Sequence, residues 1–320
     1  MADGGTAYRG TAYRGLRAAL AVLVLLATPA GARTLEVGAA KEFKQPAAAA
    51  AAAQAGDRVT IQPGTYVDCA VWKADRLVVE GIGDPASVVI REKTCGGKAL
   101  FITAGAGITI RNLTLAGARV PDANGAGIRV EGRDLTVEGV RFIDNENGIL
   151  SGADTGTLTV RDSLFERNGS CEKACAHGIY AGHIDLLRIE RSRFLGTRAG
   201  HHIKSRAART EIIGCSIEDG PTGTASYEVE LPNGGAFLLR DSTLVKGPKA
   251  DNTSAMIVIG AEGVTQPTPE ITIENNKVRD DGANTVFLRN LTATEAVLRG
   301  NQFTGPIQPL RGDGRVVAAK

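Results

Sequence analysis

The segments LTVEGVRF (135–142) and LTVRDSLF (158–165) share one pattern of side chains. Each has an apolar residue at every second position, then a short polar or glycine step, then a second apolar pair. Alternation of this kind is typical of a β-strand with one buried face. The pattern recurs at intervals of about 23 to 30 residues, with one longer interval, which indicates a repeat architecture. Its other copies are ITIRNLTL (108–115), LRIERSRF (187–194), TEIIGCSI (210–217), AFLLRDST (236–243), ITIENNKV (271–278) and AVLRGNQF (296–303).

A second pattern lies between these copies and adds another strand to each repeat. It reads AGIRVEG (126–132), NGILSG (147–152), HGIYAG (177–182), HHIKSR (201–206) and YEVELPNG (227–234). No repeat has room for the helix of a β-α-β crossover, which excludes leucine-rich horseshoes and doubly wound sheets. A β-sandwich would vary its strands instead of repeating one pattern. We therefore predict an all-β parallel β-helix, a solenoid in which like residues stack about 4.8 Å apart in successive coils.

The segment KQPAAAAAAAQAGD (44–57) suits the open apolar end of the first coil. Pro46 fits the first turn of a helix, the alanine run favours helical structure, and Gly56 favours its end. Terminal repeats of solenoids need a cap with a polar outer face. We predict a short N-terminal capping α-helix over about residues 45–55.

The N-terminal residues have the order of a secretory signal peptide. Arg9, Arg14 and Arg17 precede an apolar run over residues 18–27, and small residues follow up to Ala32. The apolar run is too short to span a bilayer, and no later run is long enough. We predict a signal peptide over residues 1–32, cleavage after Ala32, a secreted or periplasmic protein, and one β-helix domain over residues 33–320.

Charge limits the class of partner. Removal of residues 1–32 takes away three of the 37 basic residues and one of the 35 acidic residues, which leaves 34 of each. A neutral chain does not favour a nucleic acid bound through counterion release. We expect no nucleic-acid partner, no membrane span and a monomer.

The five cysteines are Cys69, Cys95, Cys171, Cys175 and Cys215. Export permits disulfides. Cys171 and Cys175 share one short loop, and Cys69 and Cys95 flank the first candidate strands, so we predict these two pairs. Cys215 lies on an apolar strand and is expected to be a free buried thiol. The chain lacks the cysteine and histidine spacing of a zinc site, and we expect no metal and no cofactor.

The chain resembles the right-handed parallel β-helix proteins of the pectin lyase-like superfamily. The segments that carry the resemblance are VTIQPGTY (59–66), NGAGIRVEG (124–132), DNENGIL (144–150) and ASYEVELPNGG (225–235). More narrowly, the chain is similar to a group of bacterial exported β-helix proteins, over essentially the whole of residues 33–320. The resemblance implies a single-stranded right-handed solenoid. It implies less about chemistry, because the superfamily includes pectate, alginate and chondroitin-type lyases, polygalacturonase-like hydrolases, epimerases and binding proteins.

The second pattern places the candidate site residues on one face. Its aliphatic residues align and are expected to point into the core; they are Ile128, Ile149, Ile179, Ile203 and Val229. Their neighbours are then expected to point outward in stacked columns. One column holds Arg129, Leu150, Tyr180, Lys204 and Glu230, and the other holds Gly127, Gly148, Gly178, His202 and Glu228. His177, His183 and His201 lie beside them, so all four histidines fall on two successive coils, which favours a ligand groove over a solvated face.

These residue types suit cleavage of an acidic polysaccharide by β-elimination. The reaction removes the proton α to a carboxyl group, stabilises the enolate and protonates the leaving oxygen. We assign Lys204 as the base, with a pKa lowered by Arg206. Arg206 or His202 would neutralise the carboxylate, and Tyr180 or His202 would act as the acid. The residues assigned to substrate binding are Arg129, His177, His183, His201, Glu228 and Glu230. The resembled lyases often use a lysine or arginine base, some of them with calcium, but these coils lack the aspartate cluster for calcium.

Other interpretations of this face stay open. Glu228 and Glu230 lie one strand repeat apart, so they could form the carboxylate pair of a glycoside hydrolase, although such pairs usually flank the bond. The same groove could bind carbohydrate without cleavage, as a binding or envelope protein. Lys204 and the two glutamates could also be solvated cross-strand ion pairs of little consequence. Several asparagines fit stacked turn ladders better than ligand contacts; they are Asn145, Asn147, Asn233, Asn275 and Asn276.

Overall fold

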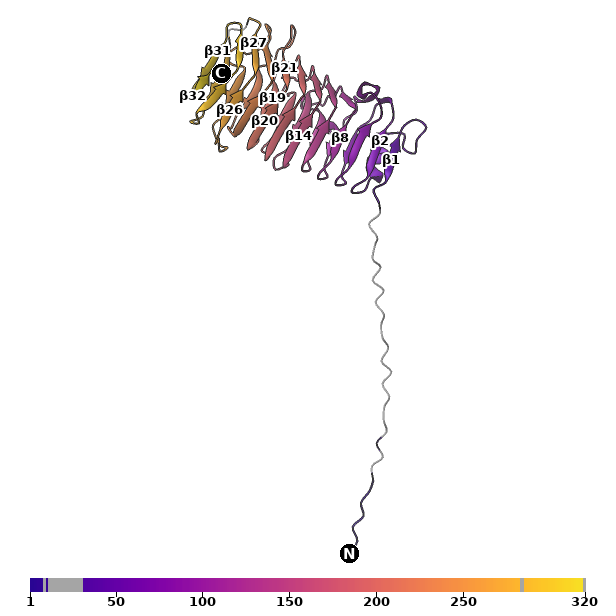
Figure 1. Cartoon of the computed structure of the whole chain (residues 1–320). Helices are drawn as coiled ribbons and strands as arrows, with labels where there is room; N and C mark the ends of the chain where they lie inside the picture. Colours follow the sequence, from indigo (N-terminus) through magenta and orange to yellow (C-terminus); the bar gives the residue numbers. More distant parts are fainter. Residues whose placement is uncertain (8–9, 11–30, 283–284, 319–320) are drawn as a thin grey trace. The chain divides into compact units, whose positions relative to one another are not determined.

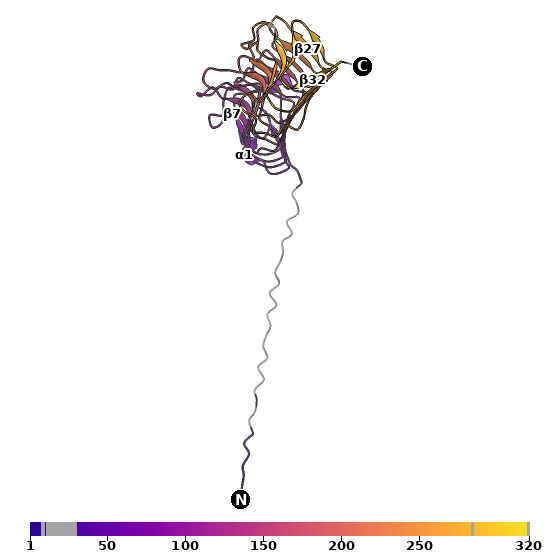
Figure 2. The same ribbon diagram turned by 90° about the vertical axis from the view of Figure 1, so that its left-hand side faces the viewer.

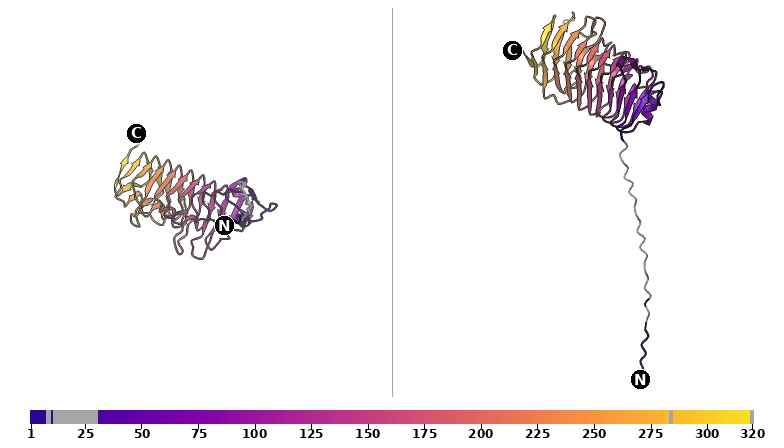
Figure 3. Two further views of the ribbon diagram at one scale, coloured as in Figure 1. Left: turned by 90° about the horizontal axis from the view of Figure 1, so that it is seen from below. Right: turned by 45° about the vertical axis from the view of Figure 1, so that its right-hand side comes forward.

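The computed structural model describes residues 1–7, 10, 31–282 and 285–318. From Thr34 onward the chain winds into a parallel solenoid whose coils stack in chain order (Figure 1, Figure 3). Most of the expected signal peptide over residues 1–32 lies outside the described residues, so it stays a prediction. Within the described ranges, no helix combines the length and the apolar character needed to cross a membrane.

Three parallel sheets form the faces of the solenoid, and each coil gives one strand to each sheet in turn. Sheet A contains β1 (Thr34–Val37), β2 (Arg58–Ile61), β5 (Val78–Gly81), β8 (Thr109–Arg111), β11 (Leu135–Glu138), β14 (Thr157–Arg161), β17 (Leu186–Glu190), β20 (Arg209–Ile213), β23 (Ala236–Arg240), β26 (Ile271–Glu274), β29 (Ala296–Arg299) and β32 (Gly314–Val317). Sheet B contains β3 (Gly64–Tyr66), β6 (Val88–Arg91), β9 (Thr114–Ala116), β12 (Arg141–Ile143), β15 (Leu164–Glu166), β18 (Arg193–Leu195), β21 (Ser216–Glu218), β24 (Thr243–Lys246), β27 (Lys277–Asp280) and β30 (Gln302–Thr304). Sheet C contains β4 (Ala70–Trp72), β7 (Ala99–Thr103), β10 (Ala126–Val130), β13 (Asn147–Ser151), β16 (Ile179–Ala181), β19 (His201–Ser205), β22 (Tyr227–Leu231), β25 (Ile257–Ile259), β28 (Val286–Asn290) and β31 (Gln308–Arg311).

The predicted alignment of the aliphatic residues in sheet C is confirmed. Ile128, Ile149, Ile179, Ile203 and Val229 pair in register from each strand to the next. All five side chains are fully buried. Burial of an aliphatic side chain of this size contributes roughly 1.5–3 kcal/mol, so the column fixes the register of sheet C strongly.

Aromatic side chains stack inside the solenoid on the sheet B side. Phe142, Phe165 and Phe194 pair in register in β12, β15 and β18. Their ring centroids are 4.5 Å apart in both steps, close to the spacing of the coils. In the next two coils the equivalent residues are Ile217 and Leu244, so the ring stack ends there.

Helix α1 (Pro46–Ala52) packs on β4 and covers the first coil, as the alanine-rich segment predicts (Figure 2). Pro46 occupies the first turn of α1, and the helix residues Ala49 and Ala50 are buried. A single turn of 3₁₀-helix, Pro85–Ser87, precedes β6.

The structure contains the two disulfides that the sequence predicts. Cys69 pairs with Cys95 and Cys171 pairs with Cys175, with Cα atoms 5.4 Å and 4.1 Å apart. Cys215 is a free thiol inside the solenoid, and burial raises its pKa to about 11. It therefore stays protonated and acts as a small apolar side chain.

Candidate functional site

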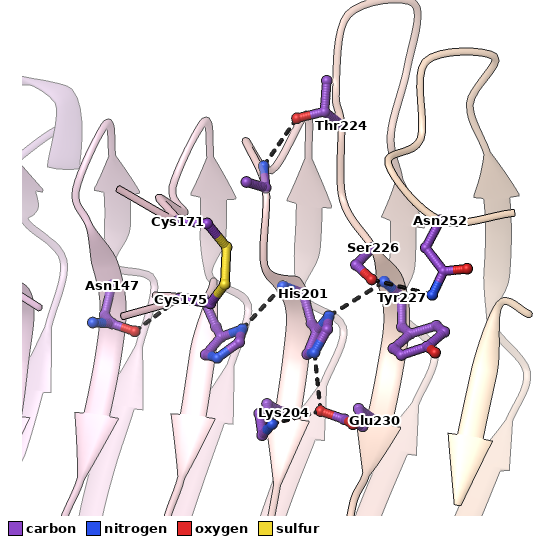
Figure 4. The surroundings of a disulfide bond; sticks show 12 residues. Asn147, Cys171, Cys175, His201, Lys204, Thr224, Ser226, Tyr227, Glu230 and Asn252 are labelled. Carbon is purple, nitrogen blue, oxygen red and sulfur yellow. Dashed lines mark hydrogen bonds and ion pairs between the residues drawn. A yellow bond between two sulfur atoms is a disulfide. The ribbon is translucent and has the colours of Figure 1, made fainter. Parts of the chain in front are cut away.

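The outer face of sheet C carries a cavity over β16, β19 and β22. Tyr180, Lys204 and Glu230 form one column on this face, because they pair in register across the three strands. The Cys171–Cys175 disulfide (Figure 4) and the loop residues Asp251, Asn252 and Glu262 also line the cavity. A rigid sheet thus presents the charged groups, and three loops enclose them.

Lys204 lies between two carboxylates. Its Nζ is 2.8 Å from Glu230 Oε2 and 2.7 Å from Glu262 Oε1, and the lysine side chain is 12% exposed. Burial acts to lower the pKa of Lys204, but the two carboxylates outweigh burial, and the pKa is raised. Arg206 pairs with the same Glu262, with Nη2 2.5 Å from Oε2. The prediction of a lysine base with a pKa lowered by Arg206 is therefore wrong.

Tyr180 faces both cations of this site. Arg206 Nε donates a hydrogen bond of 2.9 Å to the phenolic oxygen. Lys204 Nζ and Arg206 Cζ lie 5.9 Å and 5.8 Å from the centroid of the tyrosine ring, within the range of cation–π contacts. The phenolic oxygen of Tyr180 thus accepts a hydrogen bond from a cationic donor.

His177 and His201 belong to a column of side chains that accept backbone N–H groups of the following coil (Figure 4). Asn147 Oδ1 accepts from His177 N at 2.8 Å, His177 Nδ1 from His201 N at 3.0 Å, and His201 Nδ1 from Tyr227 N at 3.3 Å. A ring nitrogen that accepts carries no hydrogen, which assigns the hydrogen of a neutral ring to Nε2. His201 Nε2 then lies 2.9 Å from Glu230 Oε2.

His177 is buried, in contrast to its predicted role in substrate binding. Its side chain is almost fully covered, and burial, together with the positive charges of Lys204 and Arg206, lowers its pKa well below the usual value. The neutral ring stacks on His201 with centroids 4.8 Å apart. His177 therefore supports the backbone and the ring of His201 beneath the cavity.

His202 and Glu228 point into the interior of the solenoid, so their predicted outward orientation is wrong. Both residues have no exposed surface. His202 Nε2 lies 3.0 Å from Asp219 Oδ1, and its Nδ1 lies 2.7 Å from Thr197 Oγ1. Neither interior side chain lines the cavity on the outer face of sheet C, so the structure does not bring His202 or Glu228 to this groove.

The aromatic stack explains why this column faces inward. In earlier coils the same position is a glycine: Gly127, Gly148 and Gly178. A Cβ on Gly148 would lie 2.7 Å from the ring of Phe165, so the ring leaves no room for a side chain. The later coils have Ile217 and Leu244 in place of phenylalanine. The space so released holds His202 and Glu228.

His202, Asp219, Glu228 and Lys246 form a buried polar group that we call the interior cluster. The first three offer ligand atoms within 4.8 Å of one another, a donor set that suits a metal ion. Lys246 Nζ, however, lies 3.4 Å from Glu228 Oε2 and 3.9 Å from Asp219 Oδ2, and it donates to the carbonyl of Ser226 at 2.8 Å. The ammonium group thus supplies a cation between the carboxylates.

Arg129 and His183 line a second cavity, which adjoins the first at Tyr180. Arg129 precedes Tyr180 by two coils in the same column, with Leu150 between them. Arg206 lines this cavity as well. Of the predicted site residues, the structure thus brings these four to one face together with His201, Lys204 and Glu230.

Glu262 is the site residue that sequence analysis missed. It lies between β25 and β26, outside the repeated strands, and its backbone N–H donates to the carbonyl of Pro232 at 2.9 Å. The one signal for it is the longer interval between the segments 236–243 and 271–278. Long connections in a compact fold often carry functional residues.

Comparison with known proteins identifies the fold. A family model described as "Right handed beta helix region" matches residues 170–309. The crystal structure of alginate lyase from Paenibacillus sp. str. FPU-7 is similar, with a TM-score of 0.61 and 15% identity over 89% of this chain and 98% of that chain. ORF18 of Geobacillus virus E2 has a TM-score of 0.57 and 14% identity over 83% of this chain and 54% of that chain. Pectin methylesterase PemA from Erwinia chrysanthemi aligns with a TM-score of 0.42 and 10% identity over 88% and 81% of the two chains. No curated protein sequence matches the chain.

Proposed function

Starting from a right-handed parallel β-helix with the fold of the pectin lyase-like superfamily, we propose that the protein binds an acidic polysaccharide over sheet C and cleaves it by β-elimination. The observation that carries this proposal is the carboxylate of Glu262. It belongs to a loop, it is 42% exposed, and it bridges Lys204 Nζ and Arg206 Nη2. Two cations that hold one exchangeable carboxylate form a binding site for the carboxylate of a uronate sugar.

In this proposal the uronate carboxylate replaces Glu262 between Lys204 and Arg206. The two cations draw charge from the carboxylate and stabilise the enolate that forms when the α proton leaves. Tyr180, in its deprotonated form, takes that proton; its oxygen faces Arg206 Nε at 2.9 Å. A carbon–carbon double bond forms as the glycosidic carbon–oxygen bond breaks, and the leaving oxygen receives a proton from Tyr180. Glu230 holds Lys204 in place from the neighbouring strand, and His201, in the same strand as Lys204, contacts Glu230 in turn.

Absorbance of the unsaturated uronate product tests the proposal directly. Purified protein is mixed with polygalacturonate, alginate or hyaluronan, and polygalacturonate with its carboxyl groups methylated serves as the matched control ligand. We expect absorbance to rise with at least one acidic polymer and binding to fall for the methylated polymer. Tyr180→Phe should reduce the rate by about 10²-fold or more while binding persists, and Tyr66→Phe, in the first coils, should leave the rate unchanged.

The same experiment separates the alternatives. Binding of an acidic polymer without any rise in absorbance would contradict cleavage and leave a non-catalytic carbohydrate-binding protein. No binding of any acidic polymer would overturn the proposal as a whole. A polymeric substrate is also in keeping with export, which residues 1–32 predict and which N-terminal sequencing of the secreted protein would test.

A further inference from the structure

The second cavity on sheet C is lined by basic side chains, of which Arg206 is paired with Glu262 of the first cavity and Arg129 has no acidic partner among the described residues. Among the described residues that line it, none is an aspartate or glutamate, whereas Arg129, Arg206 and His183 all border it. The remaining walls are formed by Leu150 and by small or polar residues, with the ring of Tyr180 at the side of the first cavity. A surface pocket lined by side chains of one charge sign attracts ions of the opposite charge.

Arg129 is the unsatisfied group of this cavity. Its guanidinium makes no hydrogen bond or ion pair with any residue of the described chain, and its Nε is buried without a partner. A buried donor without a partner is costly, and such groups call for an explanation. Arg206, in contrast, uses every nitrogen, because Nε donates to Tyr180, Nη1 to Asn233 and Nη2 to Glu262.

The register of sheet C gives the direction from one site to the other. Arg129 in β10 and Lys204 in β19 stand in one column, with β13 and β16 between them. Three steps of about 4.8 Å place their backbones about 14 Å apart along the axis of the solenoid. An oligosaccharide that lies across the strands can contact both residues.

We propose that Arg129 binds the anionic group, a carboxylate or a sulfate ester, of a second sugar in the chain whose first uronate lies between Lys204 and Arg206. This inference rests on the proposed function. It states in addition that the ligand has more than one acidic sugar and runs parallel to the solenoid axis. Arginine is suited to this role, because its planar fork matches carboxylate and sulfate oxygens.

Titration calorimetry with a free uronate monosaccharide, an oligouronate and a sulfated oligosaccharide tests the inference. Arg129→Gln is compared with Arg141→Gln, which removes the same charge from the outer face of sheet B. We expect Arg129→Gln to weaken the oligouronate about tenfold or more and to leave the monosaccharide unchanged. Arg141→Gln should change neither. If Arg129→Gln loses affinity for the sulfated oligosaccharide alone, the bound group is a sulfate ester.

The negative results of this experiment can be distinguished from one another. If wild-type protein binds the oligouronate and Arg129→Gln binds it equally, the inference is wrong and the proposed function stands. Equal weakening of the monosaccharide and the oligouronate also contradicts a separate subsite. If wild-type protein binds no acidic saccharide, while circular dichroism shows it folded, the proposed function and the inference fail together.

Discussion

At the scale of single residues, Glu228 and Glu230 lie in one strand but have pKa values shifted in opposite directions. Burial raises the pKa of Glu230, but hydrogen bonds from His201 and Lys204 outweigh burial and lower it to about 2. Because this value is below the ordinary value of 4.5, the stabilisation is present above pH 4.5 and is lost as the pH falls toward 2. We expect Glu230→Gln to cost about 2–3 kcal/mol of unfolding free energy at pH 7 and progressively less below pH 4.5, as measured by urea denaturation across pH.

Glu228, whose carboxyl group lies inside the solenoid, has a pKa shifted in the opposite direction. Burial raises the pKa of Glu228 well above its usual value, and Lys246 opposes burial only in part. A carboxyl with a raised pKa in the folded state makes folding less favourable as the pH rises above 4.5. Glu228→Gln should therefore gain stability relative to wild type with rising pH. As a control, Glu295→Gln alters an exposed pair with Arg315 and should change stability by about 1 kcal/mol or less. Parallel pH curves for Glu228→Gln and Glu230→Gln would contradict this assignment.

At the scale of the element, the turns between sheets A and B are joined by a ladder of small polar side chains. Ser192 Oγ accepts from Ser163 N at 3.1 Å and donates to the carbonyl two residues before it. Ser242 Oγ accepts from Cys215 N at 3.0 Å in the same way. Cys215 itself occupies a ladder position, because its Sγ donates to the carbonyl of Ile213.

This ladder predicts that Cys215→Ser is tolerated and that Ser192→Ala is not. A serine hydroxyl at position 215 would repeat the hydrogen bonds of its neighbours. The free energy of unfolding, measured by thermal unfolding, should therefore change by less than about 1 kcal/mol. Ser192→Ala leaves the buried N–H of Ser163 without its acceptor and should cost about 1–3 kcal/mol. A large loss for Cys215→Ser with none for Ser192→Ala would show that packing, and not hydrogen bonding, determines these turns.

The loop that carries Glu262 gives a second prediction for an element. If Glu262 holds the place of a ligand carboxylate, Glu262→Gln removes a competitor from Lys204 and Arg206. Oligouronate binding should then tighten several-fold, since the ligand no longer displaces an ion pair. Glu270→Gln, which alters an exposed pair of Arg209 on the same connection, is the matched control. Weaker binding by Glu262→Gln would instead make Glu262 part of the ligand site, as measured by calorimetry for both variants.

The sequence predicts the strands better than it predicts the site, for a physical reason. Stacked coils place like residues on like, so a repeated pattern is enough to align Ile203 with its neighbours in sheet C. The direction of His202 depends instead on Phe194 and Ile217 in another sheet, whose sizes decide how much interior space is left. Glu262 comes from a connection outside the repeat, so the pattern contains no information about its place. Strand alignment follows from local periodicity, whereas the chemistry of the groove follows from contacts between sheets and loops.

At the scale of the whole molecule, the solenoid is a sum of coils, each of which depends on its neighbours. The first coil has a neighbour on one side only, and α1 takes the place of the other. The face of α1 that packs on the first coil is formed by Ala49 and Ala50, which are buried, whereas Ala48 is exposed. The stability of the N-terminal coils should therefore depend on how closely this short helix approaches them.

Ala49→Glu tests the cap, because it places a charge against the apolar end of the first coil. Burial of an unpaired carboxylate is far more costly than exposure, so α1 should lift away and the melting temperature should fall. The uncovered coil should then associate with other molecules, because an open sheet end pairs readily with another chain. Ala48→Glu adds the same charge on the outer side of the helix and should change neither property. Light scattering and thermal melts of both variants measure the effect, and equal behaviour of the two would mean that α1 does not act as the cap.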